Sequence, residues 1–397
     1  MDHDILISGG GIAGLTAAAA FGRAGFRVLC VDPAPPVTTR EAEGADLRST
    51  AFLQPARAFL GRTGLWERLE PHATPLQTMR IVDLDADGAV RATRDFDASD
   101  ISEAPFGWNL PNWLLRRELS AALEALDTVT FRPGTATTSL FTRTTSARVG
   151  LSDGSRAEVR LVIAADGRGS PMRSAAGIGV RTHRFGQKAL AFAITHDAPH
   201  GQVSTEIHRS GGPFTLVPLP DHEGRPSSAI VWMESAGEAE RLAALDEPAF
   251  EAAMTERSGG LFGPLKLASR RGLWPIIAQH AEALVAERLA LVAEAAHVVP
   301  PIGAQGLNMS LRDLAALLDL AEARPETLGD RAMLDAYERK RLPDIKLRYA
   351  GIAALNHVSM AEDPLLRSAR AMGLTALHDI APLRRGLMQL GLGTSGR

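Results

Sequence analysis

The stretch DILISGGGIAGLTAAAAFGRAGFRVLCVD, residues 4–32, decides the fold of this 397-residue chain. An apolar run, a glycine-rich turn, an alanine-rich segment and a second apolar run follow one another, which predicts strand, loop, helix and strand. Gly9, Gly11 and Gly14 have the spacing G-x-G-x-x-G. In this pattern the first glycine allows a tight turn, the second admits a pyrophosphate and the third lets the helix pack closely on the strand. The stretch therefore predicts an α/β fold with a dinucleotide-binding unit.

The residues expected to contact the dinucleotide lie at the start of the helix and at the end of the second strand. Asp32 ends that strand, where a carboxylate accepts hydrogen bonds from a ribose and disfavours a 2′-phosphate. Around the pyrophosphate we expect the residues of the glycine turn, namely Gly9, Gly11, Ile12, Ala13 and Gly14. This unit alone does not distinguish FAD from NAD.

A second informative stretch is AEAAHVVPPIGAQGLN, residues 293–308, which follows a strand-like run and precedes an amphipathic helix. Pro301, Gly303 and Gly306 favour a tight, irregular backbone. The helix that follows would present free amide groups to whatever lies in front of it, and a reduced, anionic flavin is a natural occupant. The alternative is a simple proline-glycine connection between a buried strand and a surface helix.

A third segment, LVIAADGRGSPMRSAAGI at residues 161–178, predicts a buried strand that ends at Asp166 and Gly167. In the order GGGIAG, then ADG, then AEAAH with PPIGAQGLN, the chain resembles the class A flavoprotein monooxygenases, the para-hydroxybenzoate hydroxylase superfamily. Within that superfamily it resembles most the ubiquinone-biosynthesis hydroxylases. The resemblance runs from Asp4 to about Gly391.

The resemblance implies a Rossmann-like FAD-binding domain of the glutathione-reductase type, with an inserted β-sheet substrate domain and C-terminal helices. It implies the following division: 1–77, 108–182 and 275–345 for the FAD-binding domain, 78–107 for a β excursion, 183–274 for the substrate domain and 346–397 for the C-terminal helical region.

The resemblance also assigns cofactor contacts outside the glycine turn. Arg48, in DLRSTAF at 46–52, matches the flavin-binding arginine of the family, and Arg116, in PNWLLRREL at 111–119, matches a polar residue that contacts the cofactor. For both arginines the alternative is a solvated helix face. The remaining expected cofactor contacts are Asp166, Glu294, Gly306, Leu307 and Asn308.

The chain departs from the family pattern at two places in the stretch 293–308, which is called the flavin loop below. Relatives commonly have Gly-Asp where this chain has Ala293-Glu294, and many read AGQG where this chain reads GAQG at 303–306. We expect both departures to be tolerated, with a slight shift of the strand end and weaker retention of flavin.

The activity that the resemblance implies is hydroxylation of a polyprenylated phenol in ubiquinone biosynthesis, with O₂ activated as a flavin C4a-hydroperoxide. NAD(P)H or a ferredoxin would donate electrons transiently, because no second glycine fingerprint is present. No residue is assigned to catalysis: the loop with Pro301, Gly303 and Gly306 should lie nearest the flavin, and His297 fits a structural role better than proton transfer. Substrate-pocket candidates, for which core packing is the alternative, are Leu190, Phe192, Phe214, Leu216, Pro218 and Trp232.

Two other functions fit parts of the sequence. A relative acting on a soluble aromatic acid would share the flavin motifs, although the C-terminal tail and GGPFTLVPLP at 211–220 favour a prenylated substrate. A catalytically silent flavin-binding subunit of a quinone-biosynthesis complex is the other alternative, because of Ala293-Glu294.

Composition excludes several classes of partner. The net charge is −3 and no basic run occurs, which argues against nucleic acid. No H-E-x-x-H or C-x-x-C spacing occurs, so no metal site is expected. The single cysteine, Cys30, lies in a predicted strand, where a buried and inert thiol is expected.

Localisation is expected to be cytoplasmic, because the opening strand begins at about Asp4 and leaves no room for a cleavable signal. The tail at 364–393 mixes leucine with arginine, and this composition suits interfacial helices on the inner face of the cytoplasmic membrane. We expect removal of the chain after Asp363 to impair work on prenylated substrates more than on short-chain analogues. The alternative is a pair of helices that pack on the protein itself.

Overall fold

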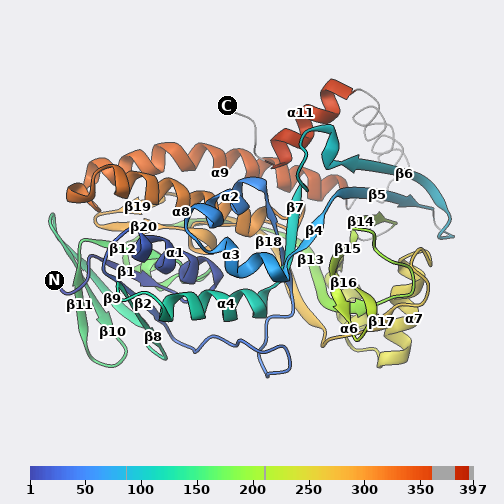
Figure 1. The fold of residues 1–397 in the computed structure, drawn as a ribbon, viewed down its shortest axis with the longest axis horizontal. Coiled ribbons are helices and arrows are strands. Elements are labelled where there is room, and N and C mark those ends of the chain that lie inside the picture. The colour runs from blue at the N-terminus through green and yellow to red at the C-terminus, as the bar shows by residue number, and fades with distance from the viewer. Residues whose placement is uncertain (86, 210–211, 360–380, 393–397) are drawn as a thin grey trace.

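The computed structural model describes residues 1–85, 87–209, 212–359 and 381–392. Two lobes lie side by side, and strands run between them in the middle of the molecule (Figure 1). One lobe contains a mostly parallel sheet with helices, and the other contains a large, mostly antiparallel sheet. The α/β class and the Rossmann-like organisation predicted from the sequence are therefore confirmed.

The parallel sheet is built around the opening strand. β1 (Ile5–Ser8) lies between β2 and β12, and these pairings are parallel. Among the described residues the strand order is β19 (Val285–Ala286), β20 (Leu289–Leu291), β12 (Leu161–Ala164), β1, β2 (Val28–Asp32) and β8 (Val129–Pro133). Since the carboxyl ends of parallel strands meet at one edge, the turn after β1, Asp32 and the ADG segment converge there.

The first and third glycines of the fingerprint are required by close backbone contacts. A Cβ at Gly14, in α1 (Ile12–Arg23), would lie 1.8 Å from the carbonyl oxygen of Gly9. Gly9 itself has φ +106°, and its Cβ would lie 2.4 Å from the carbonyl oxygen of Ala165. Only glycine lets β1, α1 and the end of β12 approach this closely.

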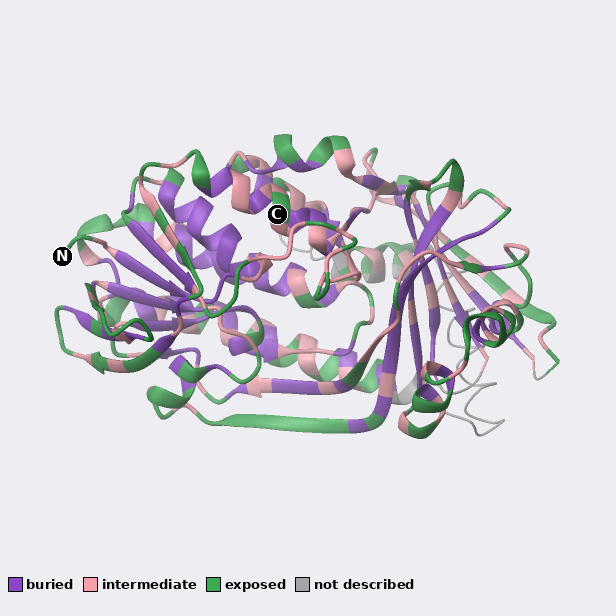
Figure 2. Cartoon of the chain, turned by 90° about the horizontal axis from the view of Figure 1, so that it is seen from below, coloured by how far each residue is buried: buried purple, intermediate pink, exposed green. Residues whose placement is uncertain are grey.

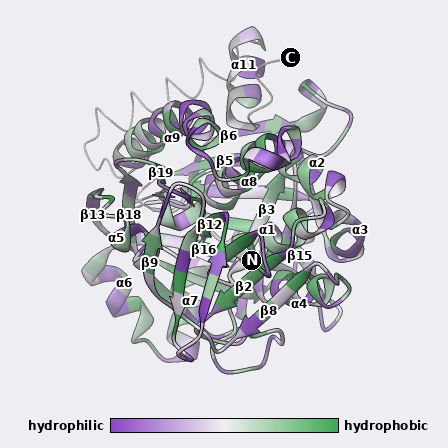
Figure 3. Cartoon of the chain, turned by 90° about the vertical axis from the view of Figure 1, so that its left-hand side faces the viewer, coloured by the Kyte–Doolittle hydropathy of each residue, from purple (hydrophilic) through white to green (hydrophobic). Residues whose placement is uncertain are grey.

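Helices and a small sheet cover the parallel sheet and share one core with it. Figure 2 shows these strands and helices largely buried, and Figure 3 shows hydrophobic residues concentrated on the interior strands near the N-terminus. The covering elements are α1, α2 (Gln54–Arg62), α3 (Trp66–Leu69), α4 (Asn112–Glu124), α5 (Pro171–Ala175) and α8 (Gln305–Ala323), with β9 (Thr137–Thr142), β10 (Ala147–Leu151) and β11 (Arg156–Val159). Cys30 is fully buried in this core, and burial raises the pKa of its thiol, so an inert thiol is the expected state.

The lobe that contains the parallel sheet is called the flavin lobe below. The large sheet of the second lobe takes its strands from several separate parts of the chain, which alternate with segments of the flavin lobe. Its order is β21 (His297–Val298), β18 (Gly272–Ala281), β13 (Val180–Thr195), β16 (Arg225–Ser235), β15 (Phe214–His222), β14 (Val203–His208), β5 (Thr78–Leu84) and β6 (Val90–Asp97), and β17 (Lys266–Leu267) pairs with β13. Strands β13 and β18 extend past the substrate-domain limits of 183 and 274 predicted from the sequence, and the division into domains stays a prediction.

The two faces of this sheet differ in character. One face carries large apolar side chains under α6 (Ala236–Ala243) and α7 (Glu247–Arg257). The other carries small residues: Ala189, Ala191 and Ala193 alternate along β13 and pair with Met233, Val231 and Ala229 of β16. Part of this alanine-rich face packs on Tyr349 and Ala353 of the helix α9 (Arg331–Ser359), which belongs to the flavin lobe. The alanine-rich face is therefore the one turned toward the flavin lobe.

A short sheet links the lobes. It consists of β3 (Ser49–Leu53), β7 (Gly107–Pro111) and β4 (Thr74–Leu76). The Asn109 side chain, fully buried in β7, donates from Nδ2 to the Pro218 carbonyl of the large sheet at 2.8 Å. This contact sets the distance between β15 and the flavin lobe.

The C-terminal part of the chain is helical where the structure describes it. α9 (Arg331–Ser359) contains Pro343 and is continuous across the boundary predicted at 345/346. α11 (Ala381–Leu392) lies beside β6 (Figure 1). The Arg384 side chain pairs there with Asp100, at 3.0 Å between Nε and Oδ2. The rest of the predicted tail, 360–380 and 393–397, lies outside the described residues.

Candidate functional site

The helix α1 begins at a place that is open to a ligand. Gly11 is its N-cap, has no capping side chain, and a Cβ there would meet no atom within 4 Å. Asp32 lies beside this opening, with Oδ2 accepting from the Gly10 amide at 2.5 Å and Oδ1 accepting from the Ala34 amide at 2.9 Å. The first turn of α1, with Ile12 and Ala13, therefore offers free N–H groups next to an oriented carboxylate, as a dinucleotide requires.

Two of the residues expected to contact the cofactor, Asp166 and Arg116, each have a buried polar atom without a partner among the described residues. Asp166 uses Oδ2 to accept from the Ser8 hydroxyl and the Met172 amide, while its buried Oδ1 has no partner. Burial raises the pKa of Asp166. The Nε of Arg116, on α4, is also buried without a partner. Buried polar atoms are normally satisfied, so both atoms fit a bound polar group such as FAD.

The flavin loop contains two alanines in a left-handed backbone conformation. Ala293 has φ +55° and Ala304 has φ +54°, and Gly303 between them has φ +61°. The resemblance implies glycine at both positions in relatives, and the left-handed backbone gives a physical reason for it: a Cβ is strained in this conformation. The departures seen in the sequence therefore store strain in the loop.

The start of α8 is likewise open. Ala304 is its N-cap without a side-chain cap, no acidic residue occupies the first turn, and a Cβ at Gly306 would meet no atom within 4 Å. Asn308 is buried, and its side chain makes hydrogen bonds within the protein. Its Oδ1 accepts from the Leu53 amide, and its Nδ2 donates to the Ala51 and Ala304 carbonyls. Asn308 thus ties the loop to β3, and any flavin contact in this turn would come from backbone N–H groups of residues such as Leu307.

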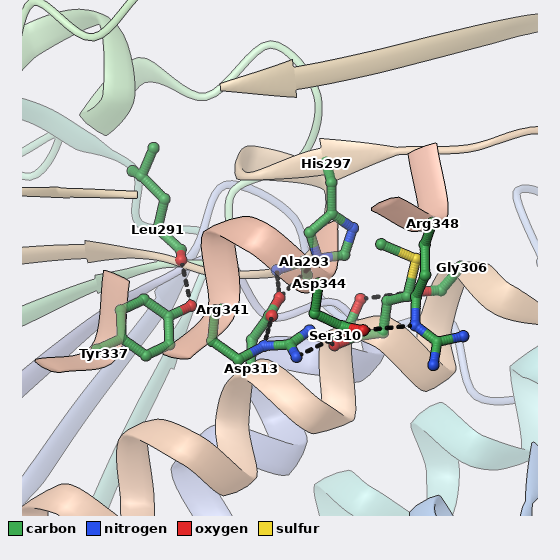
Figure 4. A network of polar contacts seen from close by, with 11 residues as sticks. Leu291, Ala293, His297, Gly306, Ser310, Asp313, Tyr337, Arg341, Asp344 and Arg348 are labelled. Carbon is green, nitrogen blue, oxygen red and sulfur yellow. Dashed lines mark hydrogen bonds and ion pairs between the residues drawn. The ribbon is translucent and has the colours of Figure 1, made fainter. Parts of the chain in front are cut away.

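A buried carboxylate lies directly behind the loop (Figure 4). Asp313 of α8 is fully buried, and its Oδ2 lies 2.6 Å from His297 Nε2 and accepts from the Ala293 amide at 3.2 Å. Its Oδ1 accepts from Arg341 Nε of α9 at 2.8 Å. One side chain therefore holds the left-handed turn at Ala293, the buried imidazole of His297 and the helix α9.

The charges in this network keep Asp313 ionised. Burial by itself would raise the pKa of Asp313, but the neighbouring His297 and Arg341 outweigh it and lower the pKa. The same partnership raises the pKa of Arg341 against the opposing effect of burial. His297, whose side chain is 1% exposed, is committed to this contact with Asp313, which supports its structural role.

The network continues along α9 to the N-terminus of α8. Arg341 also pairs with Asp344 at 2.7 Å, and Arg348 bridges Asp344 and the side-chain oxygen of Gln305, the first residue of α8. Gln305 Nε2 donates to the Gly303 carbonyl and to the Gly391 carbonyl of α11. The conformation of the loop thus depends on side chains of α8 and α9 and on a backbone carbonyl of α11.

Arg48 lies between the flavin loop and the large sheet. Its guanidinium pairs with Asp46 through two hydrogen bonds, at 2.8 and 2.7 Å, and Asn112 Nδ2 donates to the same carboxylate. Burial opposes a rise in the pKa of Arg48, but Asp46 and then Glu294 raise it. The arginine is therefore held beside Glu294, which is exposed at the end of the strand.

The residues expected to line the substrate pocket lie on the face of the large sheet that is covered by α6 and α7, not on the alanine-rich face. Phe192 and Phe250 rings are 5.1 Å apart, and Phe214 and Trp232 rings are 5.2 Å apart, in the core beneath α7. Leu190, Phe192, Phe214, Leu216 and Trp232 are all buried in this core, whereas Pro218 contributes the carbonyl bound by Asn109. This placement favours the core-packing alternative for these residues, and their role in a substrate pocket stays a prediction, because alternation along a strand cannot indicate which apolar face meets the flavin lobe.

Sequence reasoning missed Asp313, Arg341 and Asp46. The helical periodicity carried a signal for one of them: Asp313 stands among the apolar residues Leu311, Leu314 and Leu317, all buried on the same helix. A carboxylate in such a stripe is buried only when it is paired.

We predict that replacing Asp313 by Asn lowers the free energy of unfolding by about 3–5 kcal/mol, because the buried Arg341 loses its counter-charge. The lowered pKa gives the Asp313 carboxylate a stabilising effect that is present above about pH 4 and lost as pH falls through the folded-state pKa. Urea unfolding at pH 7 measures the loss. Asp319→Asn, on the same helix but exposed and paired with Arg62, is the control and should cost less than about 1 kcal/mol. Equal losses in the two variants would contradict the assignment.

Gly306→Val should weaken FAD binding at least about tenfold while leaving the stability of the apoprotein nearly unchanged, since its side chain would enter the space in front of α8. FAD titration of the apoprotein and thermal unfolding measure the two effects. Gly237→Val is a matched control, because Gly237 is also the second residue of a helix with open space at its Cβ. Wild-type FAD affinity in Gly306→Val would place the flavin elsewhere.

Ala293→Gly and Ala304→Gly should each stabilise the protein by a few tenths to about 1 kcal/mol. Glycine removes the strain of the left-handed backbone, and this gain in stability should exceed the loss that comes from the higher conformational entropy of the unfolded chain. The buried neighbour Ala295 does not have a positive φ, so Ala295→Gly should destabilise by about 1 kcal/mol. Thermal unfolding of the three variants decides the point, and a loss in all three would show that the loop is unstrained.

Comparison with known proteins agrees with the geometry of the site. Residues 2–347 match the family model described as FAD binding domain. Ubiquinone hydroxylase UbiL of Rhodospirillum rubrum is 32% identical over 394 residues, which cover 98% of this chain and 90% of that protein. The 3-demethoxyubiquinol 3-hydroxylase of Escherichia coli is 26% identical, with 98% of each chain covered.

Solved structures show the same fold. The p-nitrophenol 4-monooxygenase PnpA from Pseudomonas putida superimposes with a TM-score of 0.80 at 19% identity, covering 98% of each chain. The glycine cradle, the unpartnered atoms of Asp166 and Arg116 and the open start of α8 all fit FAD. The chain therefore belongs to the FAD-dependent monooxygenases of the para-hydroxybenzoate hydroxylase superfamily, and within them to the ubiquinone-biosynthesis hydroxylase family.

Proposed function

We propose that this monooxygenase hydroxylates the aromatic ring of a polyprenylated phenol in ubiquinone biosynthesis. The names of the relatives point to ubiquinone and its precursors, and the family resemblance points to an activated phenol ring. The route through a flavin C4a-hydroperoxide, which the resemblance implies, is part of this proposal.

The observation that carries the proposal is the alanine-rich face of the large sheet. Along β13 the residues at 189, 191 and 193 are alanines, and their neighbours Val217 and Val231 are only half-buried. We infer that the substrate ring lies against these small side chains, on the face turned toward the flavin lobe. This face is apolar, so it suits an aromatic ring with an isoprenoid chain better than the carboxylate of a soluble aromatic acid.

The protein's own groups would bind and orient the reactants. The free N–H groups at the start of α8 and the guanidinium of Arg48 offer positive charge to a reduced, anionic flavin. Asp166, Arg116 and the turn of Gly9 to Gly14 would hold the rest of FAD. When bound, the flavin supplies the electrons and the activated oxygen, and the protein supplies position and exclusion of water.

NAD(P)H or a ferredoxin is the proposed electron donor and O₂ the proposed oxidant. Only the glycine fingerprint at residues 9–14 follows a predicted strand and opens a helix, so a nicotinamide donor would bind transiently at the surface.

Contact with a membrane surface and with other quinone-biosynthesis enzymes belongs to the same proposal. Among the described residues, none of the helices has the length and hydropathy to span a bilayer. On α9, however, Leu347 and Leu355 are 68% and 57% exposed and lie eight residues apart on one side of the helix. Two exposed leucines on one side of a helix support contact with an apolar surface.

Deleting the gene and profiling prenylated quinones by mass spectrometry tests the function. We expect loss of the quinone and accumulation of a precursor that lacks one hydroxyl group, since the missing reaction adds one oxygen atom to the ring. An unchanged quinone profile, together with NAD(P)H oxidation stimulated by hydroxybenzoate or salicylate, would replace the proposal by the soluble-acid alternative.

A further inference from the structure

Trp274 is a large aromatic side chain that is 42% exposed and yet lies on the alanine-rich face of the sheet. It belongs to β18, where Trp274 pairs with Ala189 and Gly272 pairs with Ala191. Residues directly opposite each other on neighbouring strands share a face. Trp274 and Gly272 therefore stand on the face that is turned toward the flavin lobe.

Gly272 makes room for the indole. A Cβ at this position would lie 2.9 Å from Trp274 Nε1 and 3.5 Å from the Ala191 carbonyl oxygen. The indole thus lies back over Gly272, close to β13, instead of standing away from the sheet. Gly272 does not have a positive φ, so the space it leaves, and not an unusual backbone conformation, is the structural reason for glycine.

Arg48 holds the indole from the flavin side. Its guanidinium carbon lies 4.5 Å from the centroid of the Trp274 ring, within cation–π distance. The guanidinium is itself oriented by its two hydrogen bonds to Asp46, whose carboxylate also accepts from Asn112. The plane of the indole is therefore set by a flavin-lobe arginine and by the glycine beside it.

The strand register also directs the flavin loop toward this tryptophan. Gln279 of β18 pairs with Val298 in antiparallel fashion, so the chain after Val298 starts back along β18 in the direction of Trp274. The following residues, including Pro301 and Gly303, are those expected nearest the flavin ring. Glu294, at the other end of the loop, is close enough to raise the pKa of Arg48.

We propose that Trp274 is the aromatic residue against which the substrate ring packs, and that Gly272 and Arg48 fix the plane of its indole. The proposal rests on the proposed function, because it assumes a phenolic ring between the flavin loop and the alanine-rich face. The indole ring is flat and largely apolar, and edge-to-face or offset contact between aromatic rings is favourable. Trp274 would then select ring-containing substrates and orient them without touching the reacting oxygen.

The test uses the full-length, FAD-loaded protein and 2-geranylphenol as the probe, with binding followed through the absorbance change of the flavin. Trp274→Ala and Gly272→Ala should each raise the dissociation constant about tenfold, and Trp274→Phe should stay within about threefold of wild type. In Gly272→Ala the new methyl group would lie 2.9 Å from Trp274 Nε1 and displace the indole. A phenyl ring has no atom in the place of Nε1, so the double variant Gly272→Ala/Trp274→Phe should regain much of the affinity.

Trp113→Ala is the matched control, since Trp113 also stacks with an arginine, Arg117 at 5.5 Å, but on the helix α4. It should bind 2-geranylphenol like wild type. FAD content and thermal unfolding of each variant show whether it is folded, and if Trp274→Ala fails to fold, the Gly272→Ala pair still decides.

The outcomes separate the two proposals. Equal affinity in all variants, with a flavin response retained, would overturn the role of Trp274 and leave the proposed function standing. Failure of the wild-type flavin to respond to 2-geranylphenol would overturn the proposed function, and the role of Trp274 with it.

Discussion

The buried carboxylate of Asp313 is the interaction on which the site depends. An ionised side chain without solvent contact is tolerated only because His297, the Ala293 amide and Arg341 satisfy it together. These three groups belong to the 3₁₀ turn at Ala293–Ala295, the short strand β21 and the helix α9. The carboxylate thus joins the two ends of the site, namely the strand that enters the flavin loop and the long helix that supports it.

The same network helps to hold the strained backbone of the flavin loop in place. Ala293 and Ala304 occupy a conformation that favours glycine, and each is held by a hydrogen bond from a neighbour: the Ala293 amide donates to Asp313, and the Ala304 carbonyl accepts from Asn308. Strained backbone persists when surrounding contacts determine it. Two alanines are therefore compatible with the family fold here, although the loop stores more strain than one with glycines.

Polar contacts with strict geometry help to fix the relation between the lobes. Asn109 donates to the Pro218 carbonyl, Asn356 Nδ2 donates to Gln187 Oε1, and Arg48 stacks on Trp274. Hydrogen bonds and a cation–π contact have strict geometry, unlike apolar packing, so they fix both distance and orientation. The alanine-rich face is consequently held toward the flavin lobe.

The sequence by itself determined the α/β class, the FAD-binding unit and the likeness to one family, because glycine spacing and strand-helix periodicity are local properties of the chain. It also indicated where the loop departs from relatives, at Ala293 and Ala304. Only the tertiary structure decided which face of the large sheet meets the flavin lobe, since Phe192, Phe214 and Trp232 alternate as regularly as Ala191, Thr215 and Val231. The partners of Asp313 and the stack of Arg48 on Trp274 join residues far apart in the chain, and such pairs arise from packing, which no local pattern records.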